Sequence, residues 1–260
     1  MRFSQIGHRV ITEANFLATL GSISQQGLRI LMYHSVGGRA VDDPLGYNSI
    51  SKEAFIRQMD IITEDVNIST TPINLAECQS KDLNVAISFD DGYRDNLTVA
   101  APILLDRNIP FTVYVATQFV RDRQTKFMSP EELRELSSLP GVTIGAHGNT
   151  HIPLTSCDEK MLANELSSSK AYLEDLIGRE VKTMSYPHGS VNSKVHTAVE
   201  VAGYKLAACS NVGINQIGCP SLLLARTVIL SQDDDRFFGR KLHGYWDWYR
   251  LLQKNNQKRP

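Results

Sequence analysis

The stretch VAISFDDGYRDN, which spans residues 85–96, decides the fold that we predict for this chain. Its apolar start runs as far as Phe89, and Gly92 then interrupts the run, which is typical of a buried strand that ends in a tight turn. Asp90 and Asp91 stand where this strand ends. Adjacent carboxylates repel each other, and at a strand end their side chains point in different directions. A divalent cation bound by one carboxylate would offset the repulsion and leave the other free to accept a proton.

The two aspartates also have a second interpretation, as a helix cap. Asp is a common capping residue, and the pattern of residues 95–107 predicts a helix shortly after the pair. The dipeptide alone favours neither interpretation. The choice therefore depends on whether other residues of the chain can bind the same cation.

A pair of histidines can do so. His147 and His151, in the motif HGNTH, follow a second apolar run at residues 142–146. Two imidazoles four residues apart, with Gly148 between them, can converge on one metal from a helical turn or a compact loop. An isolated pair of this kind more often consists of ordinary surface or core histidines. Together with a strand-end aspartate, however, the pair provides two nitrogens and one oxygen, an open ligand set that leaves positions for water and substrate.

Length and composition limit the classes of protein that we consider. The chain has 260 residues, which is enough for one large α/β domain with a substantial core. A formal net charge of −1, with no long basic run before the C-terminal end, argues against nucleic acid as the main partner. Four cysteines without a CxxC pair are typical of reduced thiols inside a cell. The first thirty residues contain no apolar run that suits a signal core or a membrane span, so we predict a cytoplasmic protein.

Strand-like and helix-like segments alternate along the chain about seven times. The strands that we predict are residues 28–36, 85–89, 111–115, 142–146, 181–186, 204–208 and 222–229. Such alternation predicts an α/β fold of parallel strands with crossover helices, closed or nearly closed into a barrel. Active groups of such barrels gather at the carboxyl ends of the strands. The residues that fall at predicted strand ends are His34, Asp90, Asp91, His147, His151 and His188.

Several helices have clear end signals. Ser129, Pro130 and Glu132 provide a cap, a proline at the first helical position and a capping-box acid. Gly178 closes a long helix that we predict at residues 158–177. These signals agree with helices that connect successive strands.

A further helix is predicted near the start of the chain. Apolar residues recur there at helical spacing, and a glycine is placed to end the helix. These residues are Val10, Ala14, Leu17, Leu20 and Gly21. We expect this helix to pack on the domain, with contact to a membrane surface as the alternative.

The composition changes from Arg236 onward. Seven basic residues and one acidic residue give this segment a formal charge of +6, and Trp246, Trp248 and Tyr249 are interleaved with them. This combination suits an anionic membrane surface or a phosphate-bearing lipid carrier, and a terminal helix with a solvated face is the alternative. We therefore divide the chain into an N-terminal helical extension (1–27), a barrel (28–230) and a basic and aromatic helical tail (231–260).

Three ordered motifs resemble the polysaccharide deacetylase (NodB-like) family, carbohydrate esterase family 4. They are FDDG at residues 89–92, HGNTH at residues 147–151 and YPHG at residues 186–189. The resemblance covers roughly residues 29–229. It implies a distorted (β/α) barrel that removes N-acetyl, and sometimes O-acetyl, groups with a divalent metal, often zinc.

The resemblance also implies roles for residues of the motifs. Asp90 would be the general base. The residues that would bind the metal are Asp91, His147 and His151. The residues that would lie near the substrate and the developing oxyanion are Tyr186, Pro187 and His188.

Two histidines are candidates for the general acid. The sequence YHSV at residues 33–36 is similar to the N-terminal motif of the branch that includes poly-N-acetylglucosamine deacetylases. That similarity implies His34 as the acid. Many relatives carry the acid in a late LxH motif instead, which corresponds here to His243 in KLHG. We favour His34.

The chain departs from the family pattern in two places. Gly148 stands where the second motif usually has Ser or Thr, so one hydrogen bond that braces the loop is expected to be missing. The third motif normally contains an Arg that braces the base, whereas this chain reads SYPH at residues 185–188. Arg226, on the last predicted strand, is a candidate substitute, and a surface ion pair is the alternative.

The predicted function is that of a metal-dependent deacetylase that removes an N-acetyl group from an amino sugar of a surface polysaccharide or of its lipid-linked precursor. The expected cofactor is a divalent metal, with zinc favoured. The expected partners are an N-acetylated sugar, an oligosaccharide or a lipid-linked glycan, with peripheral membrane contact through the tail as a further prediction. The alternatives are an inactive glycan-binding barrel, a deacylase of O-acetyl or N-formyl groups, and a metal-dependent phosphoesterase or other amidohydrolase.

Overall fold

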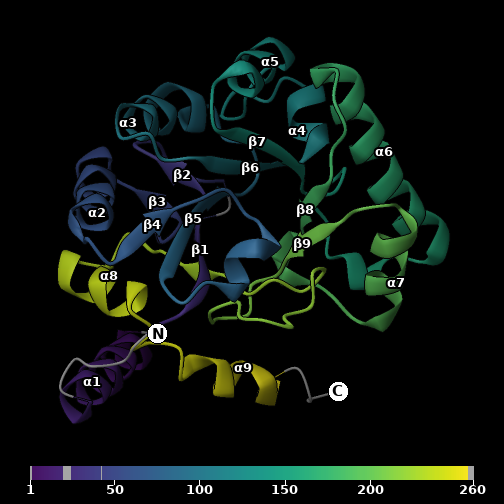
Figure 1. Cartoon of the computed structure of the whole chain (residues 1–260). Helices are drawn as coiled ribbons and strands as arrows, with labels where there is room; N and C mark the ends of the chain where they lie inside the picture. The colour runs from purple at the N-terminus through teal and green to yellow at the C-terminus, as the bar shows by residue number, and fades with distance from the viewer. Residues whose placement is uncertain (1, 20–24, 42, 257–260) are drawn as a thin grey trace.

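A computed structural model describes residues 2–19, 25–41 and 43–256 of the chain (Figure 1). Within these residues, the centre of the fold is a parallel sheet of eight strands. Seven strands are paired in the order β10-β1-β5-β6-β7-β8-β9. The eighth, β4, pairs with the start of β5, on the side opposite β1. The bounds are β1 Gly27–Tyr33, β4 Ile68–Thr70, β5 Leu83–Phe89, β6 Phe111–Val115, β7 Val142–Ala146, β8 Thr183–Ser185, β9 Leu206–Ala208 and β10 Thr227–Val228.

The sheet curves into a barrel. A parallel bridge between Ala208 and Leu224 brings the segment that leads to β10 back beside β9, which nearly closes the ring of strands. The predicted fold class, a distorted (β/α) barrel of about seven parallel strands, is confirmed. Every residue of β1, β5 and β6 is buried, which is the expected state of parallel strands covered on both faces.

Helices surround the barrel (Figure 1). Those that alternate with the strands are α2 Lys52–Glu64, α3 Ala101–Asp106, α4 Thr117–Arg121, α5 Pro130–Ser138, α6 Glu159–Ile177 and α7 Ser193–Val201. The terminal ones are α1 Arg2–Ala18, α8 Asp235–Leu242 and α9 Tyr249–Asn256. The predicted capping box of Ser129 and Glu132 starts α5, and Gly178, at φ +69°, ends α6. Both predictions are confirmed.

Two short strands, β3 (Ser49–Ile50) and β4, were not predicted. β3 forms a separate parallel pair with β2 (Ser35–Val36), which lies inside the predicted strand at residues 28–36 but is divided from β1 in the structure. Strands of two or three residues contain too few side chains to produce a recognisable alternation. Conversely, the predicted strand at residues 222–229 is shorter in the structure, because Leu224 bridges to β9 before β10 begins.

Helix α1 forms and packs on the rest of the protein, as predicted, but it does not pack through its apolar face. Val10, Ala14 and Leu17 are exposed, and Thr12 on the opposite side of the helix is buried. The inward side is held by polar contacts with the C-terminal segment, which apolar spacing alone does not reveal. The predicted positions Leu20 and Gly21 lie outside the described residues.

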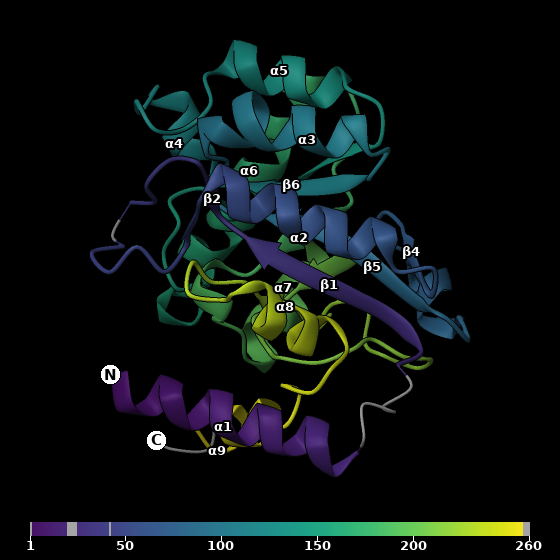
Figure 2. The same cartoon turned by 90° about the vertical axis from the view of Figure 1, so that its left-hand side faces the viewer.

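The tail is helical, as predicted, and its aromatic residues lie largely inside. Tyr245 and Trp246 are buried, and the Trp248 indole donates a hydrogen bond to Thr12 in α1. Figure 2 shows α1 and α9 together along one edge of the molecule, outside the barrel. In the part of the chain that the structure describes, none of the helices is both long and apolar enough to cross a bilayer.

Candidate active site

A cleft with a volume of about 440 Å³ opens at the carboxyl ends of the strands. It contains seven of the ten site residues predicted from the sequence: His34, Asp90, Asp91, His147, His151, Tyr186 and His188. These residues come from the ends of β1, β5, β7 and β8, so one rim of the barrel collects them.

The two aspartates diverge because the backbone turns sharply after β5. The Asp90 amide still continues the ladder, donating to the carbonyl oxygen of Tyr33 at 3.0 Å. Asp91 then adopts a φ of +74°, and Gly92 follows at +85°. A non-glycine residue in the left-handed region is strained, and such strain is often found at functional sites. Here it separates the two carboxylates and gives them different neighbours.

Asp91, His147 and His151 converge as a potential metal site. Their candidate ligand atoms all lie within 4.8 Å of one another. Oδ1 of Asp91 is 3.4 Å from His147 Nε2 and 3.1 Å from His151 Nε2. Among the described residues, this buried oxygen has no partner with hydrogen-bond geometry. Two imidazole nitrogens and a carboxylate oxygen around one point are a donor set that fits a divalent metal such as zinc.

The other imidazole nitrogen of His147 is held by β8. Nδ1 lies 3.0 Å from the carbonyl oxygen of Ser185, to which it can donate a hydrogen bond. That tautomer leaves Nε2 with its lone pair directed towards Asp91, as a metal ligand requires. Burial lowers the pKa of His147 to about 4, against the opposing influence of Asp90 and Asp91. The neutral imidazole is the form that binds a metal.

Asp91 is ionised. Burial by itself would raise its pKa, but the neighbouring imidazoles outweigh burial and hold the pKa well below its usual range. The histidines responsible are His151, His34 and His147. A carboxylate that stays ionised at neutral pH remains available as a ligand.

Asp90 is bound by Arg226. The guanidinium Nη1 donates to Oδ1 at 2.7 Å and Nη2 donates to Oδ2 at 2.8 Å. Both side chains are buried, so the alternative of a surface pair does not apply to Arg226. Burial would raise the pKa of Asp90, but the charge of the Arg226 guanidinium lowers it below its ordinary value. Oδ2 is also 3.9 Å from His147 Nε2, so an ionised carboxylate lies directly beside the potential metal site.

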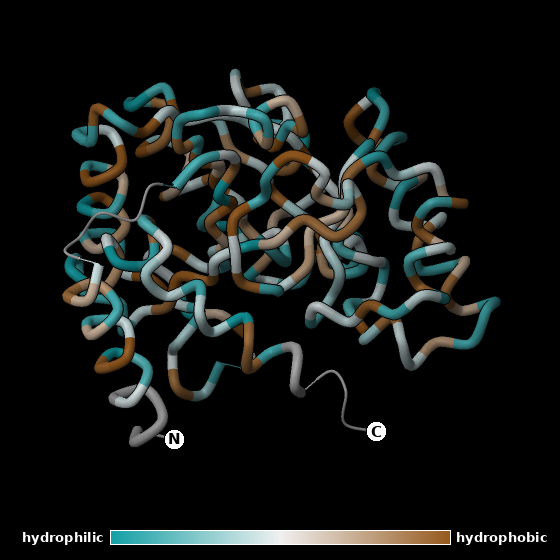
Figure 3. Tube along the Cα trace, turned by 60° about the horizontal axis from the view of Figure 1, so that its bottom comes forward, coloured by the Kyte–Doolittle hydropathy of each residue, from teal (hydrophilic) through white to brown (hydrophobic). Residues whose placement is uncertain are grey.

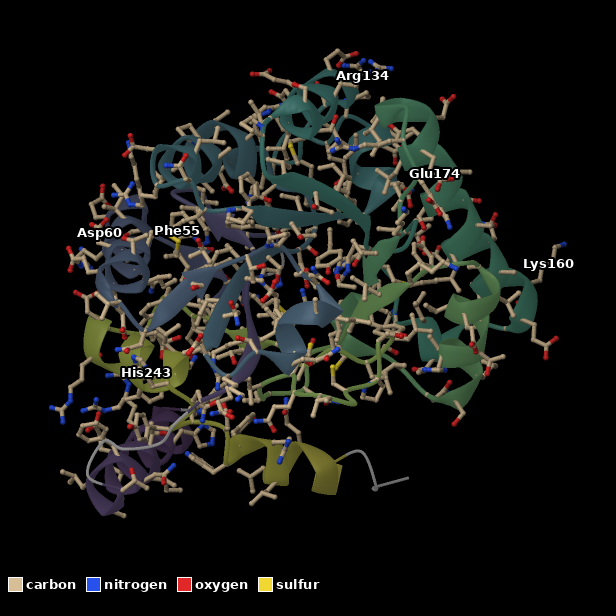
Figure 4. The ribbon with its side chains drawn as sticks, viewed as in Figure 1. Phe55, Asp60, Arg134, Lys160, Glu174 and His243 are labelled. Carbon is tan, nitrogen blue, oxygen red and sulfur yellow. The ribbon has the colours of Figure 1, made fainter. Side chains whose placement is uncertain are left out.

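The two candidate acids lie in different places. His34 lines the cleft, and its backbone carbonyl accepts a hydrogen bond from the Asn96 side chain at 2.8 Å. His243 follows α8, and its Nε2 is 3.3 Å from a carboxylate oxygen of Asp65, the residue that ends α2. Figure 4 shows His243 beside α8 at the periphery of the fold. The structure therefore brings His34, and not His243, together with the strand-end residues.

The third motif forms a tight turn at the cleft. His188 has a φ of +57°, and its Nε2 lies 3.1 Å from the carbonyl oxygen of His151. The Tyr186 hydroxyl donates to the carbonyl oxygen of Leu222 at 2.8 Å, which ties the turn to the segment before β10. Pro187 is buried beneath the loop of the second motif.

The surroundings of position 148 favour glycine. Its φ is +70°, and a Cβ there would lie 3.1 Å from Glu165 Oε2 and 3.2 Å from Pro187 Cγ. The departure from the family pattern therefore follows from crowding as well as from backbone conformation. A Ser or Thr would meet both neighbours.

Glu165, in the middle of α6, is a site-supporting residue that the sequence did not reveal. It is buried, and its Oε2 accepts the backbone amides of Asn149 and Thr150 at 2.8 and 3.0 Å. Its Oε1 accepts the Thr150 hydroxyl at 2.6 Å. The carboxylate thus braces the loop between His147 and His151. The sequence feature that could have indicated Glu165 is an acidic residue on the inward face of a predicted helix.

An aromatic wall was also missed. Tyr93 stacks on Phe127, and Phe127 stacks on Phe119, with centroid distances of 4.8 and 4.3 Å. All three residues line the cleft, and the Phe119 ring is 5.6 Å from that of His151. They come from three separate segments, so no single stretch of sequence indicates them. The wall offers an apolar surface against which a ring-shaped substrate can pack.

Known proteins share this sequence pattern and fold. The profile of the family described as polysaccharide deacetylase matches residues 78–207. YxkH of Bacillus subtilis (strain 168), a protein named for that family, is 25% identical over 192 residues. The match covers 72% of this chain and 65% of YxkH, so this chain spans less than two thirds of the length of that relative.

Solved structures agree over most of the chain. The Streptococcus pyogenes deacetylase PplD in complex with acetate has a TM-score of 0.74 at 21% identity, covering 83% of this chain and 98% of PplD. IcaB from Ammonifex degensii has a TM-score of 0.71 at 19% identity, covering 86% of this chain and 98% of IcaB. Both likenesses concern the fold.

Proposed function

The chain belongs to the polysaccharide deacetylase family, and we propose that it is a metal-dependent deacetylase that removes an N-acetyl group from an amino sugar. The observation that carries this proposal is the convergence of Asp91, His147 and His151 beside the ionised carboxylate of Asp90. A ligand set and a separate proton acceptor in one cleft are the parts that hydrolysis of an amide requires.

We assign Asp91, His147 and His151 as the residues that hold a divalent metal, with zinc favoured by the donor types. When bound, such an ion acts as a Lewis acid, which lowers the pKa of water to about 7 and polarises an acyl carbonyl. The neutral state of His147 and the ionised state of Asp91 support this assignment.

Asp90 is proposed as the general base. Its bidentate pair with Arg226 fixes the orientation of the carboxylate and keeps it ionised. An ionised carboxylate beside the attacking water can accept the proton that the water loses.

His34 is proposed as the general acid. An amine leaves poorly unless its nitrogen is protonated, so a proton donor must face the scissile amide across from the base. The position of His34 in the cleft and the distant position of His243 beside Asp65 support this choice. The turn formed by Tyr186, Pro187 and His188 is proposed to face the substrate and the developing oxyanion.

The proposed substrate is an N-acetylated sugar within an oligosaccharide, a surface polysaccharide or a lipid-linked precursor. The cleft volume lies in the range that suits small ligands, and the wall of Tyr93, Phe119 and Phe127 supports binding of a sugar ring. Roles in glycan biosynthesis and in the cytoplasm stay predictions from the sequence. The likenesses to IcaB and PplD concern the fold and do not choose among these forms of substrate.

Release of acetate and appearance of a free amine on N-acetylglucosamine oligosaccharides test the proposal. We expect both products in equal amounts from the wild-type protein. Asp90→Asn should retain the metal and lose most of the activity, because the amide cannot accept the proton. Turnover confined to O-acetyl esters or N-formyl amides would favour the alternative deacylases. Bound metal without any deacylation would favour an inactive glycan-binding barrel.

A further inference from the structure

Helix α1 packs on the protein with a polar and aromatic side. Thr12 is buried and accepts a hydrogen bond from the Trp248 indole at 3.2 Å. The Asn15 side chain donates to the Tyr245 carbonyl oxygen at 3.0 Å, and Arg9 forms an ion pair with Asp234 at 2.7 Å. The Phe16 ring packs edge-on against Tyr245, with centroids 5.0 Å apart. All of these partners belong to the tail (231–260), so this side of the helix is anchored.

The opposite side of α1 is an apolar stripe that faces solvent. Its residues are Val10, Ile11, Ala14, Leu17 and Ala18, all exposed. Val10, Ile11 and Leu17 have 62%, 48% and 65% of their surface exposed. The spacing places the five residues on one face, and the stripe itself contains no charge. Figure 3 shows apolar positions recurring along this N-terminal helix.

A surface helix of a globular protein normally has the reverse arrangement, with its apolar stripe towards the core. An uncharged apolar stripe that faces solvent is instead typical of a helix that contacts another apolar surface. In Figure 2, α1 lies along the outer edge of the molecule. The second terminal helix adds to this character, because Leu251 and Leu252 of α9 are also exposed.

The distribution of charge along the chain indicates which kind of apolar surface α1 contacts. Residues 1–27 carry two arginines and one glutamate, a formal charge of +1, and the tail, residues 231–260, carries seven basic and four acidic residues, a formal charge of +3. The whole chain has −1, so residues 28–230 carry −5. Two acidic residues of the terminal segments pair with two of their basic residues: Glu13 with Arg236, and Asp234 with Arg9. By sequence, the two terminal segments therefore carry a net positive charge, and the rest of the chain carries a net negative charge.

We propose that the apolar stripe of α1 docks on an anionic lipid surface. Basic residues attract the protein to negative headgroups, and the stripe enters the boundary between headgroups and acyl chains. A second copy of the chain is the other occupant that an apolar stripe suits. Pairing two copies through α1 would bring segments of the same net positive charge together, whereas an anionic membrane complements that charge.

The anchored side of α1 lies near the segment that borders the catalytic cleft. His8 and Arg9 of α1 and Tyr47 line a second cavity of about 300 Å³, and the next residue, Asn48, lines the catalytic cleft. If the proposed function is correct, docking on a membrane favours a lipid-linked glycan as the substrate; the docking itself does not depend on that function.

Flotation of the full-length protein with vesicles tests the proposal. Vesicles made of equal amounts of phosphatidylglycerol and phosphatidylcholine should carry the wild-type protein upward, and pure phosphatidylcholine vesicles should carry much less. Added salt should weaken the binding. The double variant Val10→Glu/Leu17→Glu should reduce the bound fraction at least about tenfold, because two charges would have to enter the lipid boundary.

The matched control is Val201→Glu. Val201 is 82% exposed on α7, which lies on the other side of the barrel from α1 (Figure 1), so its substitution should leave binding unchanged. A milder variant, Leu17→Gln, is compared if the double variant unfolds, and it should also weaken binding. Deacetylation of a water-soluble substrate should stay at the wild-type level in every folded variant, since vesicle binding requires no catalysis.

Two results would overturn the proposal. One is equal flotation of the wild-type protein and the α1 variants, or no flotation of either. The other is a wild-type dimer, measured by light scattering without lipid, that the α1 substitutions convert to a monomer. The second result would assign the stripe to another copy of the chain.

Discussion

Arg226 binds both carboxylate oxygens of Asp90, at 2.7 Å from Nη1 to Oδ1 and 2.8 Å from Nη2 to Oδ2. The two residues are 136 positions apart in the chain and come together because β10 returns beside β1, which in turn pairs with β5. Removing one member of a buried ion pair leaves the other charge without compensation. The pair therefore controls both the orientation and the protonation of the proposed base.

Arg226→Gln should move the acidic limb of the kcat/KM profile to higher pH. Burial raises the pKa of Asp90, and the Arg226 charge is the largest influence that lowers it. Without that charge the pKa rises, so a smaller fraction of Asp90 is ionised at a given acidic pH. The free energy of unfolding should fall by about 3 kcal/mol. Arg123→Gln, which breaks an exposed pair with Glu131, is the control and should shift neither quantity appreciably. An unmoved limb in Arg226→Gln would exclude Asp90 as the group that titrates.

His34→Gln should lose activity according to the leaving group of the substrate. We expect a loss of about 10²-fold or more on an N-acetylated sugar, because the amine must be protonated as it leaves. On nitrophenyl acetate, whose leaving group needs no proton, the loss should be small. His243→Gln should retain activity on both substrates, since His243 pairs with Asp65 away from the cleft. The reverse ranking of the two variants on the amide would transfer the acid role to His243.

Gly148→Ser restores the residue type that the family usually has, yet it should weaken metal binding. The new Cβ would meet Glu165 Oε2 and Pro187 Cγ at 3.1 and 3.2 Å, at a φ of +70°. Gly178→Ser is a matched control, because Gly178 has a φ of +69° and a Cβ there would have no neighbour within 4 Å. Both variants bear the backbone strain of roughly 1 kcal/mol, but only Gly148→Ser disturbs the loop of His147 and His151. Equal metal affinity in the two variants would argue against crowding at this loop.

Glu165→Gln should reduce metal affinity about 10-fold to 100-fold, the usual effect of removing a group that orients metal ligands. The carboxylate accepts the amides of Asn149 and Thr150, and an amide side chain can replace only part of that bonding. Glu174→Gln is the control: Glu174 lies on the same helix and accepts the Val181 amide at 2.9 Å. Titration calorimetry with zinc measures both variants. The same small effect in both would show that Glu165 serves the fold in general rather than the loop.

The sequence predicted the centre of the site because, in this fold, the reactive side chains lie at the ends of buried strands. Asp90, Asp91 and His147 each come directly after a continuous apolar run, and parallel strands bring such positions to one rim. Arg226 could be suggested only from the family resemblance, since its pairing depends on how the last strand returns to the first.

Other features could not be predicted because they depend on tertiary contacts. Glu165 lies in a helix of ordinary amphipathic pattern, and nothing local indicates that its side chain reaches the loop after β7. The apolar spacing of α1 predicted a helix correctly, but Thr12 and Asn15 decide which side faces the protein. The hydrophobic periodicity identifies the apolar face of a helix, but the residues that the helix packs against determine whether that face points inward or outward.

The most direct test of the account is a zinc titration of metal-free protein, with acetate release from an N-acetylglucosamine oligosaccharide as the readout. We predict no release before metal is added, a rise to a plateau at one ion per chain, and loss of both binding and release in His151→Ala. Undiminished release of acetate from the metal-free protein in the presence of a chelator would contradict the account.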